Sequence, residues 1–464
     1  MDLTAPAVRA DLVERLARLY AGGPVILGPG VLAGYTSTVA GLRERGCRIL
    51  VLSTARGAGP VPGPDECTVV ELETPTTRLV TDELRLLDHL AHHLPDHAVA
   101  AIECFDRSGE AVWNTGHFVA DDEPILGRRV VGGRPAAYLR MEDKLFAEEV
   151  WAACNVPTAP HLVVPVEETG LAEATAALAG PLGAVWTGDT RDGFHGAGNY
   201  VRWVLDEADL AVAQSFFALH CDRVRVMPFL DGVPCSIHGF VLPDGTAALR
   251  PVEIVVLRKV ASREFVYGGL SSYWDPPDAD RAEMRAITRR VGDWLQAEHA
   301  YRGAFGIDGV LTADGFRPTE LNTRLPAGAV RLADVDRELF ELLQTHLVAG
   351  LDTGVTVADL EGLVPLMDAE RTGQPVAIGQ GVSLGTSDEY DLAWDGTTLT
   401  KARGKTGNTL VLADTPSGFF SKISPCAALA PGDRLAPVNA ALLAYLDCEY
   451  DAGFGPVEAA PDLR

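Results

Sequence analysis

Four side chains in one short stretch of the sequence have the chemistry to bind a metal ion and a phosphate. The stretch GIDGVLTADGFRPTELNTRLPAG contains Asp308, Glu320, Asn322 and Arg324. Two carboxylates and an amide oxygen, with no histidine or cysteine among them, suit Mg²⁺ or Mn²⁺ better than Zn²⁺. The planar guanidinium of an arginine matches the oxygens of a phosphate or a carboxylate. These residue types indicate metal-assisted chemistry on a phosphorylated compound, provided that the fold brings them together.

A β-hairpin would place the four side chains on one face. With Ala313-Asp314-Gly315 as a three-residue loop, glycine supplies the left-handed residue that this favoured form needs. Asp308 then lies directly across from Glu320, and their side chains share a face. Asn322 is two residues further along and shares that face, and Arg324 continues the alternation if the strand reaches it. A two-residue loop would shift the register by one and separate the two acids.

The two opposed carboxylates predict a bound cation. At about 4 Å their repulsion is roughly 1 kcal/mol in water and several-fold more in a partly buried cleft. A divalent cation removes this penalty, and Mg²⁺ usually shares its ligands with substrate phosphates. Asp308 and Glu320 therefore predict a site for a metal and a triphosphate. The alternative is a solvated hairpin face, on which the charged groups meet only water.

The N-terminal part of the chain predicts an α/β unit. GPVILGPG at residues 23–30 predicts a strand, TSTVAGLRERG a helix with Thr36 or Ser37 as N-cap, and CRILVLS a second strand. Residues 98–105, AVAAIECF, predict a further buried strand. The glycines of the first turn do not have G-x-G-x-x-G spacing, so they give little support to a dinucleotide site.

The elements that follow Arg140 are of mixed type. A helix begins near Met141, and a strand at Gly183–Thr187 leads into a glycine-rich loop at Gly188–Gly198. Several strands come next, then a helix at Asp280–His299 with an apolar face at helical spacing. Past the hairpin, the sequence predicts a second helix near residues 338–349, a Gly/Thr-rich tail of β character and a closing helix.

Length, charge and cysteine usage limit the functions open to the chain. Its 464 residues suggest two to four domains, and its net charge of −25 argues against a nucleic-acid partner, since phosphate backbones need basic surfaces. No apolar run approaches a membrane span, and the N-terminal residues lack the apolar core of a secretory signal. The eight cysteines form no C-x-x-C pair, so we expect neither a zinc site nor a redox motif. We interpret them as mostly buried thiols in a reducing cytoplasm and not as a disulfide framework. We expect a cytoplasmic protein without membrane contact.

The hairpin resembles a known element. ELNTRLPAG is similar to the E-x-N-x-R strand of the ATP-grasp superfamily of carboxylate–amine ligases, with Asp308 at the upstream acid position. The resemblance covers roughly residues 141–350. The order of a lysine, a glycine-rich loop, a hinge strand and a metal hairpin agrees with it. The resemblance implies ATP as cofactor, with Mg²⁺, or alternatively Mn²⁺, held by Asp308, Glu320 and Asn322.

The layout implied by the resemblance combines α/β and α+β classes. A Rossmann-like pre-ATP-grasp domain is expected over residues 1–140. Two ATP-grasp lobes are expected to follow, residues 141–225 with a glycine-rich flap and residues 226–355 with the metal hairpin. A small mixed C-terminal domain is expected over residues 356–464.

The resemblance also implies cofactor-binding residues outside the hairpin. Lys144 matches the first phosphate-contacting lysine, and the glycines of the flap match the loop over the phosphates. His195 lies in the flap, where we weigh a role in proton transfer against a solvent-exposed loop position. The hinge VMPFL at residues 226–230 matches the strand whose backbone reads the adenine edge. The residues predicted to bind ATP are Lys144, Thr187, Gly193, His195, Gly196, Gly198, Met227, Phe229 and Leu230.

The strand before the flap departs from the family pattern. Many members carry a second lysine on the strand before the flap, where this chain has Thr187, and Arg202, Arg225 and Arg258 are candidates to replace it. We assign catalytic roles to Arg324, which would steady an acyl-phosphate, and to Arg258. Glu253 faces either the substrate or a structural partner. The segment VYGGLSSYWDPP at residues 266–277 is either a mobile substrate lid or a plain surface loop.

The whole-chain layout is similar to that of peptide ligases of the pheganomycin-synthesis type. This implies amide formation through an acyl-phosphate, with release of ADP and phosphate, in natural-product biosynthesis. The expected partners are an amino-acid carboxylate and the amine of an amino acid or peptide, and a homodimer is one assembly that the sequence leaves open. The alternatives are a ligase of free amino acids that makes a dipeptide or small amide, and an ATP-binding module without ligase activity.

Overall fold

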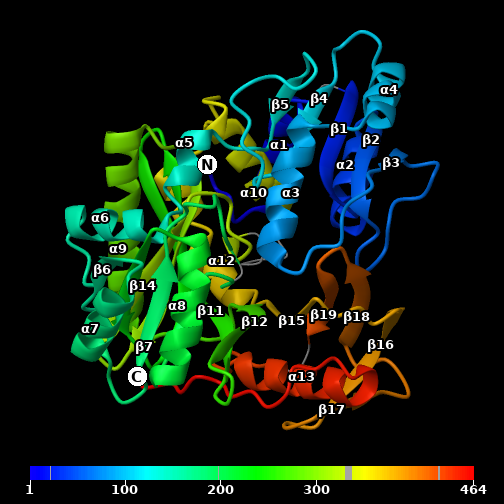
Figure 1. The fold of residues 1–464 in the computed structure, drawn as a ribbon. Helices are drawn as coiled ribbons and strands as arrows, with labels where there is room; N and C mark the ends of the chain where they lie inside the picture. Colours follow the sequence, from blue (N-terminus) through cyan, green and yellow to red (C-terminus); the bar gives the residue numbers. More distant parts are fainter. Residues whose placement is uncertain (21, 197, 330–336, 427–428) are drawn as a thin grey trace.

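The N-terminal third of the chain contains a parallel sheet with helices on both faces (Figure 1). The computed structural model covers residues 1–464 and describes all of them except residues 21, 197, 330–336 and 427–428. The strand order β3-β2-β1-β4-β5 runs outward in two directions from neighbouring strands β1 and β4. The strands are β1 (Pro24–Val31), β2 (Arg48–Ala55), β3 (Thr68–Glu71), β4 (Val112–Asn114) and β5 (Arg129–Val131).

Alternate residues of β1 and β2 enter two different cores. Val25 and Leu27 belong to one buried cluster, whereas Ile26 belongs to another on the opposite face. Parallel strands buried on both faces read as continuous apolar runs, which is why the sequence reveals these two strands so clearly. The elements that cover the sheet are α1 (Pro6–Ala17), η1 (Leu32–Tyr35), α2 (Thr36–Glu44), α3 (Val80–His92) and α4 (Asp96–Phe105). Helix α5 (Ala136–Arg140) follows β5 and buries Tyr138 in another core.

Two local predictions in this region were wrong. Residues 98–105 form most of helix α4 and not a strand, with Ala98 and Ile102 buried at i, i+4 spacing. Periodicity alone does not separate a short buried helix from a buried strand. Helix α2 follows η1 directly, so Tyr35 is its N-cap, and the hydroxyl of Thr36 donates instead to the carbonyl of Pro60.

A four-stranded antiparallel sheet of order β6-β9-β7-β8 forms the next region. The buried rings of Trp186 and Phe217 lie in its core. Its strands are β6 (Leu162–Pro165), β7 (Ala184–Gly188), β8 (Val201–Val204) and β9 (Arg223–Pro228), and its helices are α6 (Lys144–Ala153), α7 (Glu168–Leu178) and α8 (Glu207–His220).

One ten-stranded sheet, of order β14-β13-β10-β11-β12-β15-β19-β18-β16-β17, contains the rest of the described strands. Its first half has β10 (Val233–Leu242), β11 (Gly245–Lys259), β12 (Glu264–Ser271), β13 (Gly303–Thr312) and β14 (Gly315–Asn322). Its second half has β15 (Gly373–Gln380), β16 (Ser387–Trp394), β17 (Leu399–Lys401), β18 (Asn408–Thr415) and β19 (Gly418–Cys426). The remaining helices are α9 (Asp278–His299), α10 (Arg337–Val348), α11 (Val357–Glu361), α12 (Val364–Ala369) and α13 (Ala436–Tyr450).

The ten-stranded sheet crosses the domain boundary expected at residues 355 and 356. Strand β12 pairs with β15 through Leu270 opposite Gln374, so the last part of the chain extends the sheet of the metal hairpin. The prediction of a lid or surface loop at residues 266–277 was wrong. Residues 264–271 form β12 inside the sheet, and Trp274 just beyond it is buried.

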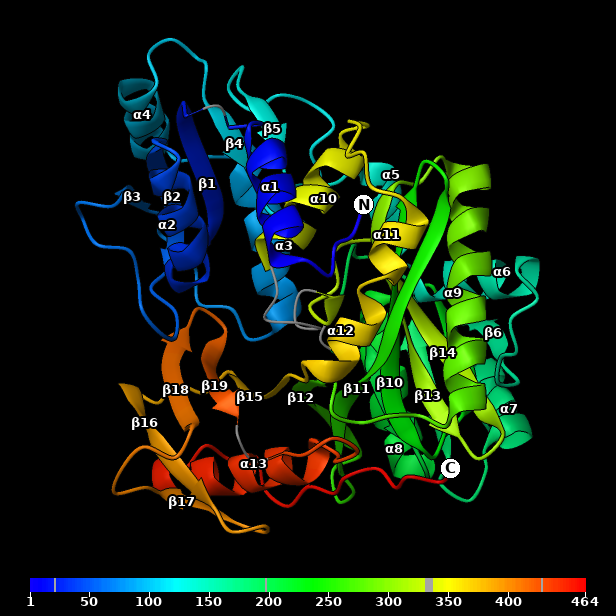
Figure 2. The same ribbon diagram turned by 180° about the vertical axis from the view of Figure 1, so that it is seen from behind.

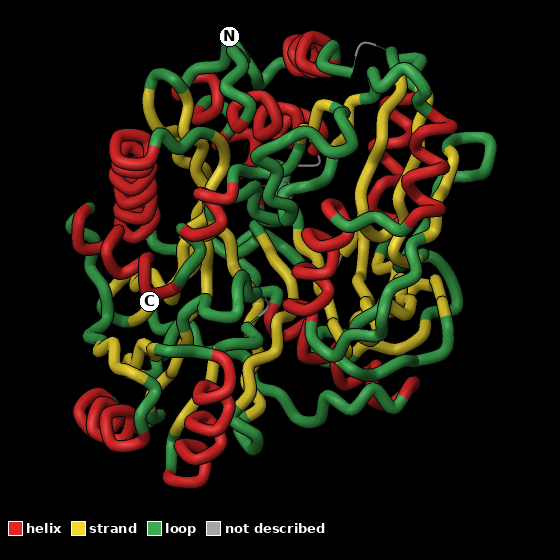
Figure 3. The backbone as a smooth tube through the Cα atoms, turned by 45° about the horizontal axis from the view of Figure 1, so that its top comes forward, coloured by secondary structure: helices red, strands yellow, loops and turns green. Residues whose placement is uncertain are grey.

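The parallel sheet, the hairpin region and the C-terminal strands lie around a common centre. Figures 1 and 2 show the parallel sheet above the C-terminal strands and α13, with the hairpin region beside both. Seen with its top brought forward, the chain has helices against sheets in every region (Figure 3). Among the helices of the described residues, none has the length and apolar character needed to span a membrane. The predicted combination of α/β and α+β structure is confirmed.

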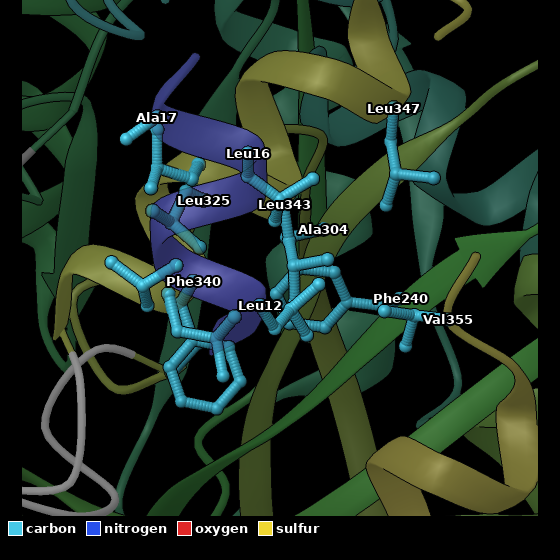
Figure 4. Close-up of a cluster of buried hydrophobic side chains, with 14 of the residues drawn as sticks. Leu12, Leu16, Ala17, Phe240, Ala304, Leu325, Phe340, Leu343, Leu347 and Val355 are labelled. Carbon is cyan, nitrogen blue, oxygen red and sulfur yellow. The ribbon is translucent and has the colours of Figure 1, made fainter. Parts of the chain in front are cut away.

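A shared apolar core joins the N-terminal helix to the hairpin region (Figure 4). Leu12 and Leu16 of α1 lie in one buried cluster with Phe340 and Leu343 of α10. Leu325, which follows Arg324 in the chain, is buried in the same cluster. Close packing at Leu325 therefore restricts the position of the neighbouring arginine.

Candidate functional site

The hairpin brings Asp308 and Glu320 together, but by a different route from the predicted one. Thr312 pairs with Gly315, so the loop is the two residues Ala313 and Asp314, and the three-residue loop was wrong. That register alone would separate the acids. A bulge between the pairs Gly309–Pro318 and Asp308–Glu320 adds one residue to β14 and restores their pairing, which is confirmed.

The sequence contributes to the bulge through Pro318. Pro318 lacks the N–H that a regular ladder position needs, and proline in a sheet is confined largely to edges and bulges. Strand β14 is the edge of the ten-stranded sheet, where such a residue is tolerated. The extra residue, Thr319, donates its hydroxyl to the Asp308 carbonyl at 3.2 Å. Its own carbonyl accepts from the buried Arg225 at 2.9 Å.

Both oxygens of the Asp308 carboxylate accept hydrogen bonds. The Ser236 hydroxyl donates to one at 2.6 Å, and the Asn322 amide donates to the other at 3.0 Å. His238 Nε2 lies 3.0 Å from the Ser236 oxygen. With the hydroxyl proton directed at Asp308, Nε2 is the donor in that bond. A chain from His238 through Ser236 to Asp308 therefore orients this carboxylate.

The imidazole of His238 fits only because two glycines face it. A Cβ atom at Gly328 would lie 2.2 Å from the ring, and one at Gly306 would lie 3.3 Å from it. His238 is buried, and burial lowers its pKa to about 3, so the ring is neutral. Among the described residues, its Nδ1 has no hydrogen-bond partner.

Lys144 contacts the other acid of the pair. Its ammonium lies 2.7 Å from a Glu320 carboxylate oxygen, although the two residues are far apart in sequence. Lys144 is the first residue of α6, and the Asp143 side chain caps that helix by accepting from the Leu145 amide. The other Asp143 oxygen accepts from the Thr190 hydroxyl at 2.8 Å, which ties the start of the flap to the lysine helix.

Arg324 joins the hairpin to a second buried acid. Its guanidinium donates to Asn322 Oδ1 at 2.6 Å and to Glu142 at 2.7 Å, and it lies over the Phe118 ring. Glu142 is buried and also pairs with Arg134 at 2.5 Å. Burial opposes ionisation of Glu142, but the charges of the two arginines outweigh it and lower the pKa.

The two opposed acids are electrostatically unequal. Burial and then the charge of Glu320 raise the pKa of Asp308 to about 6. Burial also acts to raise the pKa of Glu320, but the charge and hydrogen bond of Lys144 exceed it and lower the pKa. Two close carboxylates that share a site commonly separate in this way.

The flap, defined as residues 188–198, is held against the parallel-sheet region. Gly193 and Gly198 have positive φ, which explains glycine at these two positions. The Gly196 amide donates to the Thr81 hydroxyl of α3 at 3.1 Å, and Arg85 donates to the carbonyls of Phe194 and Gly193. Helix α3 therefore holds the described part of the flap in place.

His195 is buried in the flap and stacks on Tyr200 with ring centroids 4.3 Å apart. The alternative of a solvent-exposed loop histidine was wrong. Burial and then the charge of Lys144 lower its pKa to about 4, so the ring is neutral near pH 7. Among the described residues, its Nε2 is buried without a hydrogen-bond partner.

Of the three arginines considered in place of the missing lysine, Arg225 contacts Thr187. Its Nε donates to the Thr187 hydroxyl at 3.1 Å, and its other nitrogens donate to Glu148 and to the carbonyls of Lys144 and Thr319. These contacts join the flap strand, the lysine helix and the bulge. Arg225 therefore fixes the positions of neighbouring groups.

The hinge and Arg258 form a separate group. The Phe229 amide donates to the Gly183 carbonyl at 3.0 Å, so this donor already has a partner within the protein. Met227 is buried, and Leu230 is half-buried. Arg258 pairs with Asp231 at 2.8 Å and lies over the Phe229 ring. These contacts place Arg258 beside the hinge, and the structure does not connect it with the hairpin acids.

The sequence analysis missed Ser236, His238, Glu142 and Arg134. They lie on elements distant in sequence from the hairpin, and only strand pairing and packing bring them near it. An alternating pattern on β10 was the one local signal. The sequence PCSIHGF places Ser236 and His238 on the same face of the strand.

A divalent cation fits this donor set. Among the described residues, no group of three or more His, Cys, Asp and Glu side chains could hold a metal. The hairpin has two carboxylates and adds an amide, an all-oxygen set typical of Mg²⁺ sites that share ligands with phosphates. The cations in contact with the set, Lys144 and Arg324, are of the kind that bind phosphate oxygens.

Comparisons with known proteins give similarity of structure only. No family model matches the sequence, and no curated protein matches it. A carboxyaminoimidazole ribonucleotide synthase from Aspergillus clavatus, complexed with ATP, is 12% identical, with 92% of this chain and 98% of that chain covered and a TM-score of 0.49. A phosphoribosylamine–glycine ligase from Thermotoga maritima is 15% identical, with coverages of 94% and 97% and a TM-score of 0.47. The biotin carboxylase subunit of pyruvate carboxylase is 12% identical, with coverages of 87% and 86% and a TM-score of 0.46.

Proposed function

We propose that the chain is an ATP-dependent carboxylate–amine ligase of the ATP-grasp type. The observation that carries the proposal is the face shared by Asp308, Glu320 and Asn322, with Lys144 and Arg324 in direct contact with it. Two half-buried carboxylates in cross-strand register are unfavourable without a cation. The positive side chains of Lys144 and Arg324 beside these carboxylates suit a ligand with several negative charges, such as a triphosphate.

The proposed reaction has two steps. A carboxylate oxygen of the first substrate attacks the γ-phosphorus of ATP, the bond to the β-phosphate oxygen breaks, and ADP leaves. The amine nitrogen of the second substrate then attacks the acyl carbon of the acyl-phosphate. The carbon–oxygen bond to phosphate breaks, inorganic phosphate leaves, and the nitrogen loses its proton to phosphate or water. No covalent enzyme intermediate is needed.

The residues of the site have two roles, which are binding of the phosphates and exclusion of water. Asp308, Glu320 and Asn322 would hold a divalent ion, which would compensate the charge on the phosphates. Lys144 binds phosphate oxygens, and Arg324 holds the acyl-phosphate through its planar guanidinium. The flap excludes water that would hydrolyse this intermediate.

The substrates follow from the resemblance of the layout to pheganomycin-type peptide ligases. We propose an amino-acid carboxylate and the amine of an amino acid or peptide, in natural-product biosynthesis. A ligase of two free amino acids is the nearest alternative. Thr187 in place of a lysine favours a third candidate, an ATP-binding module without ligation. The contact of Arg324 with Asn322 argues against that module, because nucleotide binding alone has little need of this arginine.

The test is release of ADP and phosphate from Mg-ATP across a panel of amino-acid carboxylates, with and without amine acceptors. Mass spectrometry identifies the products. ADP together with a product lighter by one water than its components is the expected result. AMP would contradict the acyl-phosphate and indicate an adenylate. Bound ATP without turnover across the panel would favour the ATP-binding module.

A further inference from the structure

A cavity of about 1030 Å³ begins at Arg324 and extends between the parallel sheet and the C-terminal strands. One wall is formed by the carboxyl ends of β1 and β4, at Gly30 and Gly116. These are the two neighbouring strands from which the sheet runs in opposite directions. In open parallel sheets, ligands bind in the crevice at this position.

The charge of the cavity is opposite to that of the protein. Its described lining includes the cations Arg324, Arg371 and Lys422 and one ion pair, Arg337 with Glu341 at 2.8 Å, whereas the whole chain has a net charge of −25. A cleft lined by one sign of charge concentrates ligands of the other sign. The cavity therefore selects for anions in a protein whose overall charge repels them.

The cations come from two separate parts of the chain. Arg324 is at the hairpin end, in contact with Asn322. Arg371 and Lys422 come from the C-terminal side, where Lys422 pairs with Val376 across β15 and β19. The Arg371 guanidinium is fixed by the carbonyl of Ser272 at 2.7 Å and by Asp275 at 2.9 Å. The C-terminal part of the lining therefore presents positive charge from segments well separated in sequence from the hairpin.

Resting on the function proposed above, we infer that this cavity binds a substrate with a second anionic group, a carboxylate or a phosphate, remote from the reacting centre. The C-terminal strands hold that group through Lys422, with Arg371 beside it. A volume near 1030 Å³ is at the top of the range for small-molecule sites, so the substrate is larger than one amino acid. A peptide with its free C-terminal carboxylate has both properties.

The first experiment measures anion binding without turnover. The full chain is saturated with Mg²⁺ and a non-hydrolysable ATP analogue, so that the nucleotide site is filled. Glutarate and inorganic phosphate are then titrated against sodium chloride of equal ionic strength, and the thermal midpoint is recorded. We expect stabilisation beyond that of chloride, and the anion that binds more tightly identifies the group.

Two variants and one control locate the binding. Lys422→Met keeps the length of the side chain and removes its charge, and we expect the apparent dissociation constant to rise roughly 10- to 100-fold, as for loss of a charge-assisted bond. Lys401→Met, on β17 outside the described lining, is the control and keeps wild-type binding. If Lys422→Met does not fold, Arg337→Gln at the same cavity replaces it, with a weaker but measurable loss.

A second experiment uses matched substrates in the ADP-release assay. Dipeptides are compared with their C-terminal amides, which differ only in the anionic group. We expect the amides to have a KM at least roughly tenfold higher with wild type, and no such difference with Lys422→Met. Equal use of acids and amides, or anion binding unchanged by Lys422→Met, would overturn the inference and leave the ligase proposal intact. Selective anion binding without ADP release from any compound would support the inference about the cavity and contradict the ligase proposal.

Discussion

At the scale of single residues, the site depends on how firmly one carboxylate is held. Asp308 accepts a hydrogen bond from Ser236 and another from Asn322, one on each oxygen, so the carboxylate is not free to rotate. Loss of a group that orients a metal ligand typically lowers metal affinity or activity roughly 10- to 100-fold. His238 extends this support one step further into the core.

Replacing Glu320 tests the metal assignment. Glu320→Gln removes one of two carboxylates while keeping the size of the side chain, so we expect Mg²⁺-dependent ADP release to fall at least about 100-fold. Asp314→Asn, in the turn of the same hairpin, is the matched control. Wild-type turnover in Glu320→Gln, with the fold verified by circular dichroism, would refute the assignment.

Replacing Ser236 tests the support of Asp308. Ser236→Ala removes the bond to one Asp308 oxygen, and we expect affinity for the divalent ion to fall roughly 10- to 100-fold. Electron paramagnetic resonance of free Mn²⁺ in the presence of ADP measures this affinity independently of turnover. Ser215→Ala, on the exposed part of α8, is the control. Equal Mn²⁺ affinity in wild type and Ser236→Ala would show that the contact has no such role.

At the scale of elements, the hairpin and the flap are each positioned by something outside themselves. The bulge in β14 brings Glu320 opposite Asp308, and Arg225 binds the bulge carbonyl from another sheet. The flap is held by α3, whose Val80 amide also donates to Gln380 of β15. Helix α3 therefore contacts both the flap and the C-terminal strands.

Weakening the contact between α3 and the flap should admit water to the intermediate. Thr81→Ala removes the hydroxyl that accepts from Gly196, and Arg85→Met removes the donor to Phe194. We expect the ratio of ADP released to amide formed to rise several-fold above the wild-type value. Limited proteolysis should also cut the flap faster. Asp82→Asn, on the same turn, is the control, and an unchanged ratio with unchanged proteolysis would contradict the role of α3.

At the scale of the whole molecule, the C-terminal region is continuous with the hairpin region. One sheet runs from β14 to β17, and Glu253 of β11 is fully buried against Arg434, 2.6 Å away, just before α13. The structural alternative for Glu253 is therefore the one that the structure supports. Because the hairpin strands and the C-terminal strands share one sheet, loss of packing in the C-terminal region should also affect the hairpin region.

Removing the partner of Glu253 should destabilise the protein as a whole. Arg434→Met leaves a buried carboxylate without its charge partner, although the Leu435 amide still donates to it, and we expect a loss of about 2–4 kcal/mol. Burial already raises the pKa of Glu253. Protonation removes the buried negative charge, so the difference in free energy of unfolding between the variant and wild type should shrink as pH falls. Urea denaturation at several pH values measures this, with the exposed Arg403→Met as control. Adding Glu253→Gln should recover part of the loss, and a deficit that does not depend on pH would contradict the explanation.

Local sequence was enough to predict the hairpin and two of the five parallel-sheet strands, β1 and β2. Alternation with period two places Asp308, Glu320 and Asn322 on one face, and these residue types limit the chemistry to an oxygen-liganded cation. Helix α4 and strand β12 escaped prediction because short apolar segments have no distinctive period, and the partners that decide them are distant. The turn was wrong because the bulge at Thr319 depends on the edge position of β14 and on contacts with Arg225.

The sequence by itself determined that two carboxylates, an amide and an arginine belong to one hairpin, because their residue types and spacing are local, whereas the bulge set the register that pairs Asp308 with Glu320. Only the tertiary structure decided which side chains complete the site. Lys144, Glu142 and Ser236 come from elements far along the chain, and packing, which has no local signature, places them at the hairpin. The cationic cavity is likewise formed from three regions, and the net charge of the chain gives no indication of it.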